Sequence, residues 1–155
     1  MSDALTAARE FLAARRIVVA GVSRDRNQPA NLIYRRLRET GHEVAATNPS
    51  AESVEGDPCY PDLRAVPGAV DGVVIATPPA AAADVARACV ALGVPRVWMH
   101  RSFGEGSVSP EAVGLCRDAG IQVIVGGCPM MYCGKVDFGH RCMRWILEVR
   151  GRIEA

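Results

Sequence analysis

Short apolar runs alternate along the chain with longer segments in which apolar residues recur at helical spacing. The apolar runs predict buried strands, because strands of a parallel sheet are covered on both faces. The amphipathic segments predict the helices that cover them. The predicted strands are Ile17–Ala20, Val44–Thr47, Gly72–Ala76, Arg96–Met99 and Gln122–Val125. The predicted helices are Asp3–Ala13, Gln28–Glu39, Ala80–Leu92, Pro110–Ala119 and Phe138–Arg150.

This alternation predicts an α/β fold: a Rossmann-like, doubly wound parallel sheet of about five strands in three layers. With 155 residues, 49% of them hydrophobic, the chain is long enough for one buried core, so we expect a single domain over residues 1–155. In such folds ligands bind beyond the carboxyl ends of the strands, where the strand order reverses. The loops that follow the strands are therefore the candidate site.

The loop after the first predicted strand has the residue types of a phosphate-binding turn. Gly21 allows a sharp bend and a close approach to a phosphate, and Val22 and Ser23 follow it. Arg24 and Arg26 add positive charge beside a helix N-terminus, which itself favours anions. The dinucleotide fingerprint is broken, because Ser23 and Arg26 stand where its second and third glycines belong. An ordinary loop with surface arginines is the alternative.

Two further loops complete the candidate nucleotide site. After the second strand come Asn48 and Pro49, with no acid at the strand end to accept hydrogen bonds from an NAD ribose. Glu52 and Glu55 lie farther along, so this corner is expected to tolerate a phosphorylated ribose. After the third strand, Thr77–Pro79 predicts a rigid apolar wall for adenine or a pantetheine arm, or simply a proline-initiated helix.

The order of these residues resembles the CoA-binding domain family over roughly residues 10–130. That family consists of small stand-alone Rossmann-like proteins, similar to the N-terminal domain of the succinyl-CoA synthetase alpha subunit. The matching positions are Gly21–Ser23, Asn48–Pro49, Gly56, Cys59–Pro61, Val70–Asp71, Thr77–Pro79, Gly93 and Val97–Trp98.

The resemblance implies that the ligand is coenzyme A or an acyl-CoA. It places the phosphates near Gly21–Arg26, the nucleotide end beside Asn48 and Pro49, and another wall at Thr77, Pro78 and Pro79. Many small members carry Arg-Pro-Ser where this chain has Gln28–Ala30, so Arg24 or Arg26 is expected to supply the missing positive charge. No attached catalytic domain is implied.

The C-terminal segment brings three thiols and an imidazole together within fifteen residues: Cys128, Cys133, His140 and Cys142. Their spacing is not a standard zinc pattern, and packing of free thiols is favoured over a metal site or redox chemistry. A mixed disulfide between Cys128 or Cys133 and the thiol of CoA is a further hypothesis. An enzyme that acts on acyl-CoA through these cysteines also stays open.

Charge and composition narrow the classes of function. A net charge of +1 and a pI near 7.6 argue against a nucleic-acid surface. Two prolines, Asp84 and Arg87 interrupt Val73–Val94, so no membrane span is expected. The absence of a secretory signal predicts a cytoplasmic protein with reduced thiols. His100, paired in sequence with Glu105, is interpreted as a solvent-facing loop histidine rather than a catalytic group.

Two hypotheses for the function remain. The first is a CoA or acyl-CoA binding protein, non-catalytic or regulatory. The alternative is an NAD(P)-dependent oxidoreductase or a sensor of nicotinamide nucleotides. The broken glycine repeat and the missing ribose acid favour the first. A homodimer, formed through a sheet edge or the terminal helix, is possible in either case.

Overall fold

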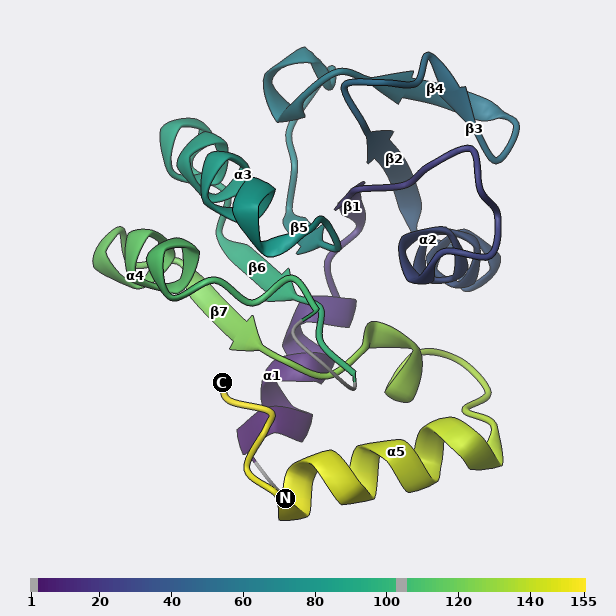
Figure 1. Ribbon diagram of the computed structural model, residues 1–155, viewed down its shortest axis with the longest axis vertical. Helices are drawn as coiled ribbons and strands as arrows, with labels where there is room; N and C mark the ends of the chain where they lie inside the picture. The colour runs from purple at the N-terminus through teal and green to yellow at the C-terminus, as the bar shows by residue number, and fades with distance from the viewer. Residues whose placement is uncertain (1–2, 103–105) are drawn as a thin grey trace.

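The computed structural model describes residues 3–102 and 106–155. Its centre is a seven-stranded sheet in the order β3-β4-β2-β1-β5-β6-β7 (Figure 1). All neighbouring strands are parallel except β3 and β4, which pair antiparallel at one edge. The strands are β1 (Arg16–Ala20), β2 (Glu43–Thr47), β3 (Ser53–Val54), β4 (Asp57–Tyr60), β5 (Gly72–Ile75), β6 (Arg96–Met99) and β7 (Gln122–Val125).

Helices cover both faces of the sheet, which confirms the doubly wound, three-layer architecture (Figure 1). The helices are α1 (Asp3–Leu12), α2 (Pro29–Glu39), α3 (Pro79–Leu92), α4 (Pro110–Asp118) and α5 (Phe138–Val149), with short 3-10 helices η1 (Leu63–Ala65) and η2 (Pro129–Met131). Side chains alternate along β1: Ile17 and Val19 pack in the core under α1, α2 and α5, whereas Val18 packs under α3 and α4.

The sheet has two more strands than the sequence predicts. β3 and β4 follow β2 and form the edge hairpin, in which Ser53 pairs with Pro58 and Val54 with Asp57. These strands are two and four residues long and carry turn-forming and charged residues, so they have no readable apolar period. Pairing of β4 with β2, and of β3 with β4, rather than local preference, makes them strands.

The order of the strands reverses at β1. The chain runs from β1 to its neighbour β2 and then crosses to β5 on the other side of β1. After β1 the chain turns to α2 on one face of the sheet, and after β5 it turns to α3 on the other face, so a crevice opens beyond the carboxyl ends of β1 and β5. Gly21 follows β1 directly, and Ala76 follows β5.

None of the helices in the described ranges is long and apolar enough to cross a membrane.

Candidate functional site

Gly21 brings three loops together at the strand-order reversal. Its φ of +104° is in the left-handed region, and its N–H donates to the Thr47 carbonyl at 2.9 Å. A Cβ at this position would lie 2.5 Å from the carbonyl oxygen of Ala76. Only glycine therefore allows the loop after β1 to lie against the loop after β5.

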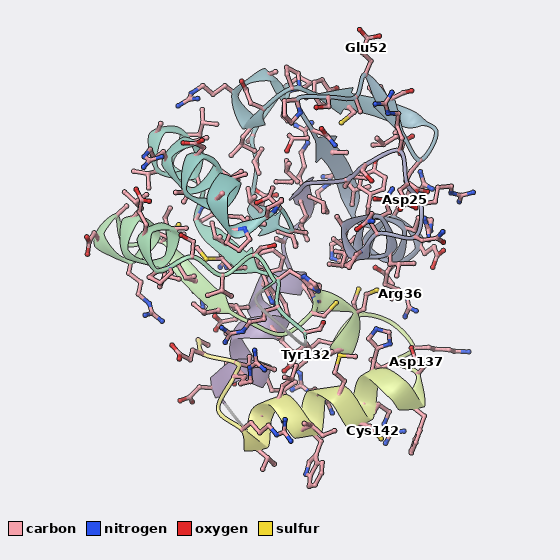
Figure 2. All side chains as sticks on the ribbon, in the orientation of Figure 1. Asp25, Arg36, Glu52, Tyr132, Asp137 and Cys142 are labelled. Carbon is pink, nitrogen blue, oxygen red and sulfur yellow. The ribbon has the colours of Figure 1, made fainter. Side chains whose placement is uncertain are left out.

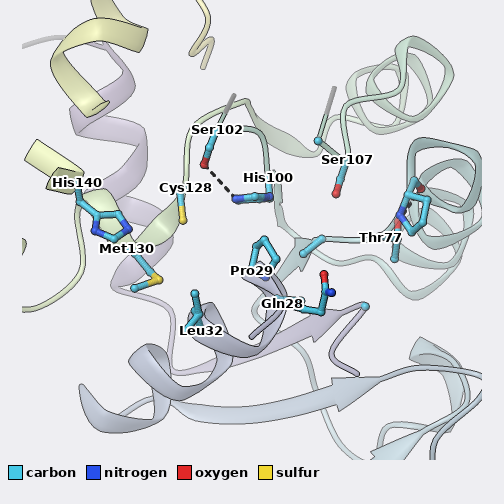
Figure 3. Close-up of a pocket in the computed structure, with 15 residues that line it drawn as sticks. Gln28, Pro29, Leu32, Thr77, His100, Ser102, Ser107, Cys128, Met130 and His140 are labelled. Carbon is cyan, nitrogen blue, oxygen red and sulfur yellow. Dashed lines mark hydrogen bonds between the residues drawn. The ribbon is translucent and has the colours of Figure 1, made fainter. Parts of the chain in front are cut away.

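Two cavities open on either side of this contact, and Gly21, Thr77 and Pro78 line both of them. The first, which we call the α2 cavity, has a volume of about 460 Å³ and lies between the start of α2 and the ends of β6 and β7 (Figure 3). The second, the β2 cavity, has about 440 Å³ and lies between the loops after β2 and β5. Asn48 and Pro49 line the β2 cavity.

The helices that begin at this crevice have no side-chain caps. Neither the N-cap residue of α2, Gln28, nor that of α3, Pro78, makes a capping hydrogen bond. By contrast, Ser109 accepts the Ala112 N–H in α4, and Asp137 caps α5 in the same way. Uncapped N-termini present N–H donors and partial positive charge. Two such termini meet where the α2 and β2 cavities adjoin, so this crossing point suits an anion.

The loop after β1 holds its shape through its own hydrogen bonds. The Ser23 N–H donates to Asn31 Oδ1 at 3.0 Å, and the Ser23 hydroxyl accepts the Asp25 N–H at 3.2 Å. Val22 is buried, and its carbonyl accepts the side-chain amide of Asn48 at 3.0 Å. The Ser23 hydroxyl also donates to the Asp25 carbonyl at 3.3 Å, so both the N–H and the hydroxyl of Ser23 already have partners in the loop and in α2.

Arg24 and Arg26 lie apart from the two cavities. They line a third cavity of about 420 Å³, together with Ser53–Gly56. The structure therefore groups the predicted site residues in three places. Gly21, Thr77 and Pro78 lie at the crevice, where Pro79 begins α3. Asn48 and Pro49 line the β2 cavity beside it. The two arginines line the third cavity, on the other side of the loop after β1.

A buried carboxylate, that of Glu55, stabilises the loop after β1 through Asn31. The Glu55 side chain is 0% exposed, and its Oε1 accepts Asn31 Nδ2 at 2.9 Å and Arg35 Nη1 at 2.7 Å. Arg26 Nε lies 3.4 Å from Oε2. Burial alone would raise the pKa of Glu55, but the Asn31 hydrogen bond and the two guanidinium charges outweigh it and lower the pKa. Glu55 is thus ionised and neutralised.

Sequence reasoning missed this network. The detectable part was Asn31, a polar residue on the buried face of an otherwise amphipathic helix. Its partner Glu55 lies far away in the chain and has a backbone φ of +53°, which no sequence pattern indicated.

The β2 cavity contains charged residues that the sequence did not place there. Asp62 and Asp84 line it, but the first caps η1 through the Ala65 N–H at 3.1 Å, and the second pairs with Arg87 at 2.6 Å. Arg64, also in the lining, is exposed. The cavity therefore offers one guanidinium that was not among the predicted site residues.

The interpretation of His100 as solvent-facing is wrong. The side chain is 8% exposed and lines the α2 cavity, with Nε2 3.4 Å from Ser102 Oγ (Figure 3). Burial lowers its pKa to about 4, so the ring is neutral at pH 7. The backbone of Ser107 lies beside that of His100, because the Ser107 N–H donates to the His100 carbonyl at 2.7 Å. Glu105 lies outside the described residues.

The C-terminal cysteines do not gather in one place. Cys128 lines the α2 cavity, and burial raises the pKa of its thiol to about 11. Cys133 is buried elsewhere, with its sulfur 3.2 Å from Thr40 Oγ1. His140 lines the α2 cavity, whereas Cys142 lies on α5. Within the described ranges, no three His, Cys, Asp or Glu side chains are arranged to hold a metal ion.

Relatives of known sequence and structure point to one family. Residues 15–134 match the CoA binding domain family. The chain is 30% identical over 143 residues to the ADP-forming acetate–CoA ligase I of Archaeoglobus fulgidus, covering 88% of this chain but only 21% of the ligase. It thus spans about a fifth of that relative.

Solved structures agree with this match. A hypothetical protein from Pyrococcus horikoshii superposes with a TM-score of 0.76 at 25% identity, over 83% of this chain and 88% of that one. A dinucleotide-forming acetyl-coenzyme A synthetase of Candidatus Korarchaeum cryptofilum, in complex with phosphate and ADP, gives a TM-score of 0.61 at 29% identity, over 70% and 25%. With the Rossmann-like fold and the crevice at Gly21, these matches show that the chain belongs to the CoA-binding domain family.

Proposed function

We propose that this protein binds CoA or an acyl-CoA across the crevice at Gly21. The adenosine occupies the β2 cavity, the pantetheine arm occupies the α2 cavity, and the diphosphate crosses between them. Membership of the CoA-binding domain family supports the identity of the ligand. The observation that carries the placement is the pair of uncapped helix N-termini at this crossing point.

The proposed diphosphate site uses backbone donors more than side chains. The first residues of α2 and α3 are prolines without an N–H, and the third residues donate to the Gln28 and Pro78 carbonyls. The Ala30 and Ala80 N–H groups are therefore the proposed donors. Gly21 leaves room for the phosphate oxygens because it has no Cβ. Arg24 and Arg26 are proposed to add long-range positive charge, since Arg26 is already held by Glu55. Ser23 shapes the loop through Asn31 and Asp25.

The proposed adenosine site combines apolar walls with an exposed guanidinium, that of Arg64. Asn48 and Pro49 form one side, and Leu63 and Val85 supply apolar surface for the base. A CoA nucleotide differs from that of NAD by its ribose 3′-phosphate. Arg64 lines this cavity and is the residue that we propose contacts that phosphate.

The proposed pantetheine site lies in a cavity that favours binding over catalysis. Leu32 and Met130 provide apolar contacts for the arm. Ser102 and His100 have the residue types of a nucleophile and its base, but a ring with a pKa of about 4 is a weak base at neutral pH. The thiol of Cys128, with a pKa of about 11, is protonated there. These properties support a non-catalytic or regulatory role.

One observation keeps the nicotinamide alternative open. Asp62 and Asp84 line the cavity proposed for the nucleotide, and carboxylates accept hydrogen bonds from the ribose hydroxyls of NAD. Both carboxylates already have partners, which favours CoA.

Isothermal titration of the intact protein with CoA, NAD and NADP separates these candidates. We expect micromolar or tighter binding of CoA and weaker or undetectable binding of both nicotinamide nucleotides. Binding of NAD or NADP without binding of CoA would reject the proposal in favour of the alternative.

A further inference from the structure

The outer face of α5 is an apolar stripe with no partner within the described residues. Phe138, Trp145 and Val149 are 79%, 66% and 69% exposed, and they are among the most exposed large apolar side chains of the molecule. Cys142 lies between them and is half-buried. At 100° per residue these four positions share a stripe roughly 60° wide.

A different face attaches α5 to the rest of the protein. Leu147 is buried in the core under the sheet, and Met143 packs against it. Tyr132 donates to Glu148 at 3.0 Å and lies under the Arg144 guanidinium, 5.3 Å from it. In Figure 2, Tyr132 lies on the side of α5 toward the sheet and Cys142 lies on the other side. The stripe is therefore not needed to hold the helix in place.

We propose that α5 is the interface of a homodimer in which two copies of this helix pack antiparallel along the stripe. The four positions are spaced by four, three and four residues, which is the spacing of a coiled-coil seam. These intervals are the same when counted from either end of the helix. A two-fold axis between residues 143 and 144 therefore places Phe138 against the partner's Val149 and Cys142 against the partner's Trp145.

The charges beside the stripe fit the antiparallel arrangement. Arg141 and Glu148 are seven residues apart and flank the stripe on the same side; Glu148 lies at the border of the two faces, where its Oε1 also accepts the Tyr132 hydroxyl. Antiparallel helices bring this side of one copy against the same side of the other, so Arg141 faces the partner's Glu148, and the pair occurs twice by symmetry. A parallel pairing would instead face Arg141 toward the side that carries Gly139 and Ile146. Charge complementarity thus selects a second copy and its direction.

The size of the contact indicates a weak dimer. Two exposed aromatic side chains and a valine from each copy bury on the order of 800 Å² in total. This is less than the roughly 1,200 Å² that stable complexes bury and falls in the range of weak, transient contacts, so we expect a dissociation constant of tens to hundreds of micromolar.

Sedimentation equilibrium of the intact chain from about 1 to 500 μM tests the proposal. We expect a monomer–dimer equilibrium for the wild type and for Leu92→Glu, which replaces a half-exposed apolar residue on α3. Trp145→Glu should weaken the dimer and raise its dissociation constant at least tenfold. A monomer throughout this range, or equal effects of the two substitutions, would overturn the proposal.

Charge reversal tests the direction of the helices. Arg141→Glu and Glu148→Arg should each weaken the dimer, and the double variant should recover it to within about threefold of the wild type. Failure of the double variant to recover, with helical content unchanged by circular dichroism, would exclude the antiparallel interface.

Cross-linking gives an independent readout. Cys142 is the least buried of the six cysteines, so a short bis-maleimide should link two chains through it in the wild type and not in Cys142→Ala. Binding of α5 to phosphatidylserine vesicles by a protein that stays monomeric and does not cross-link would assign the stripe to a membrane surface instead.

Discussion

Gly21 is the single residue on which the geometry of the crevice depends. Its missing side chain lets the loops after β1 and β5 touch, and its positive φ turns the chain toward α2. The sequence indicated this position through a β-branched run that ends in glycine. It could not indicate that the close neighbour is the Ala76 carbonyl, because that contact comes from the pairing of β1 with β5.

Replacement of Gly21 by alanine separates the two loops. We expect Gly21→Ala to lower the free energy of unfolding by about 3 kcal/mol and to weaken CoA binding at least tenfold. Gly41→Ala is the matched control, since its φ is +90° but a Cβ there meets nothing within 4 Å. It should cost about 1 kcal/mol and leave CoA binding unchanged. Urea unfolding measures the change in stability and calorimetry the change in CoA affinity. If the two substitutions changed both quantities equally, this role of Gly21 would be refuted.

Arg64 provides a test of the nucleotide end. Arg64→Ala should weaken binding of CoA about tenfold and leave binding of 3′-dephospho-CoA unchanged, because only CoA carries the phosphate that the guanidinium is proposed to contact. Arg96→Ala, at the opposite end of the sheet, is the control. A loss of affinity that is the same for both ligands would argue against a 3′-phosphate contact.

Cys128 is expected to react slowly near neutral pH. Its thiol has a pKa of about 11 and the thiolate is the reactive form, so modification by CoA disulfide should accelerate about tenfold per pH unit between pH 7 and 10. Cys133 contacts Thr40 and does not line the cavity, so it should not form the adduct. Peptide mass spectrometry reports both sites. A rate of adduct formation that does not change with pH, or an adduct on Cys133, would contradict this account.

At the scale of elements, the starts of α2 and α3 distinguish the site. Proline in the first turn of each helix was readable in the sequence, and it also predicts an ordinary helix start. The absence of a side-chain cap beside a cavity is what makes these termini candidates for a phosphate. That property depends on where the helices lie and not on their own residues.

The network around Glu55 supports the start of α2 and should depend on pH. The pKa of Glu55 is lowered in the folded protein, so its stabilising effect is complete well above the ordinary value of 4.5 and is lost as the pH falls through the lowered value. We expect Glu55→Gln to reduce the free energy of unfolding at pH 7 by about 2 kcal/mol.

Urea unfolding at pH 7 and pH 3 measures this effect. The difference between the wild type and Glu55→Gln should shrink at the lower pH, because protonation removes the same charge in the wild type. Glu52→Gln is the control, since Glu52 projects from the edge of the molecule (Figure 2). A difference that grows toward pH 3 would contradict the ionised state of Glu55.

Sequence periodicity was sufficient for the five helices and the five apolar strands, because each carries a complete apolar pattern of its own. It was insufficient for β3 and β4, which are strands only through pairing at the sheet edge. The same distinction holds in the site. Gly21, Asn48 and Thr77 follow strands and could be found, whereas the burial of His100 and the position of Arg64 depend on tertiary packing.

At the scale of the whole molecule, the strand-order reversal explains why the site has two cavities. β2 and β5 flank β1 on opposite sides, so the loops that follow them diverge and leave a space on each side of Gly21. A long ligand with a charged middle fits this arrangement better than a compact one. The α5 stripe lies on another part of the surface, so self-association and ligand binding can be measured separately.

The central claim is that the diphosphate of CoA lies between the first turns of α2 and α3. Amide chemical shifts of the isotope-labelled protein, followed by NMR during titration with CoA, test it most directly, with pantetheine as the ligand that lacks phosphate. The account predicts saturable shifts of the Gly21, Ala30 and Ala80 amides with CoA and much smaller ones with pantetheine. Saturation with CoA that leaves these three amides unmoved would contradict it.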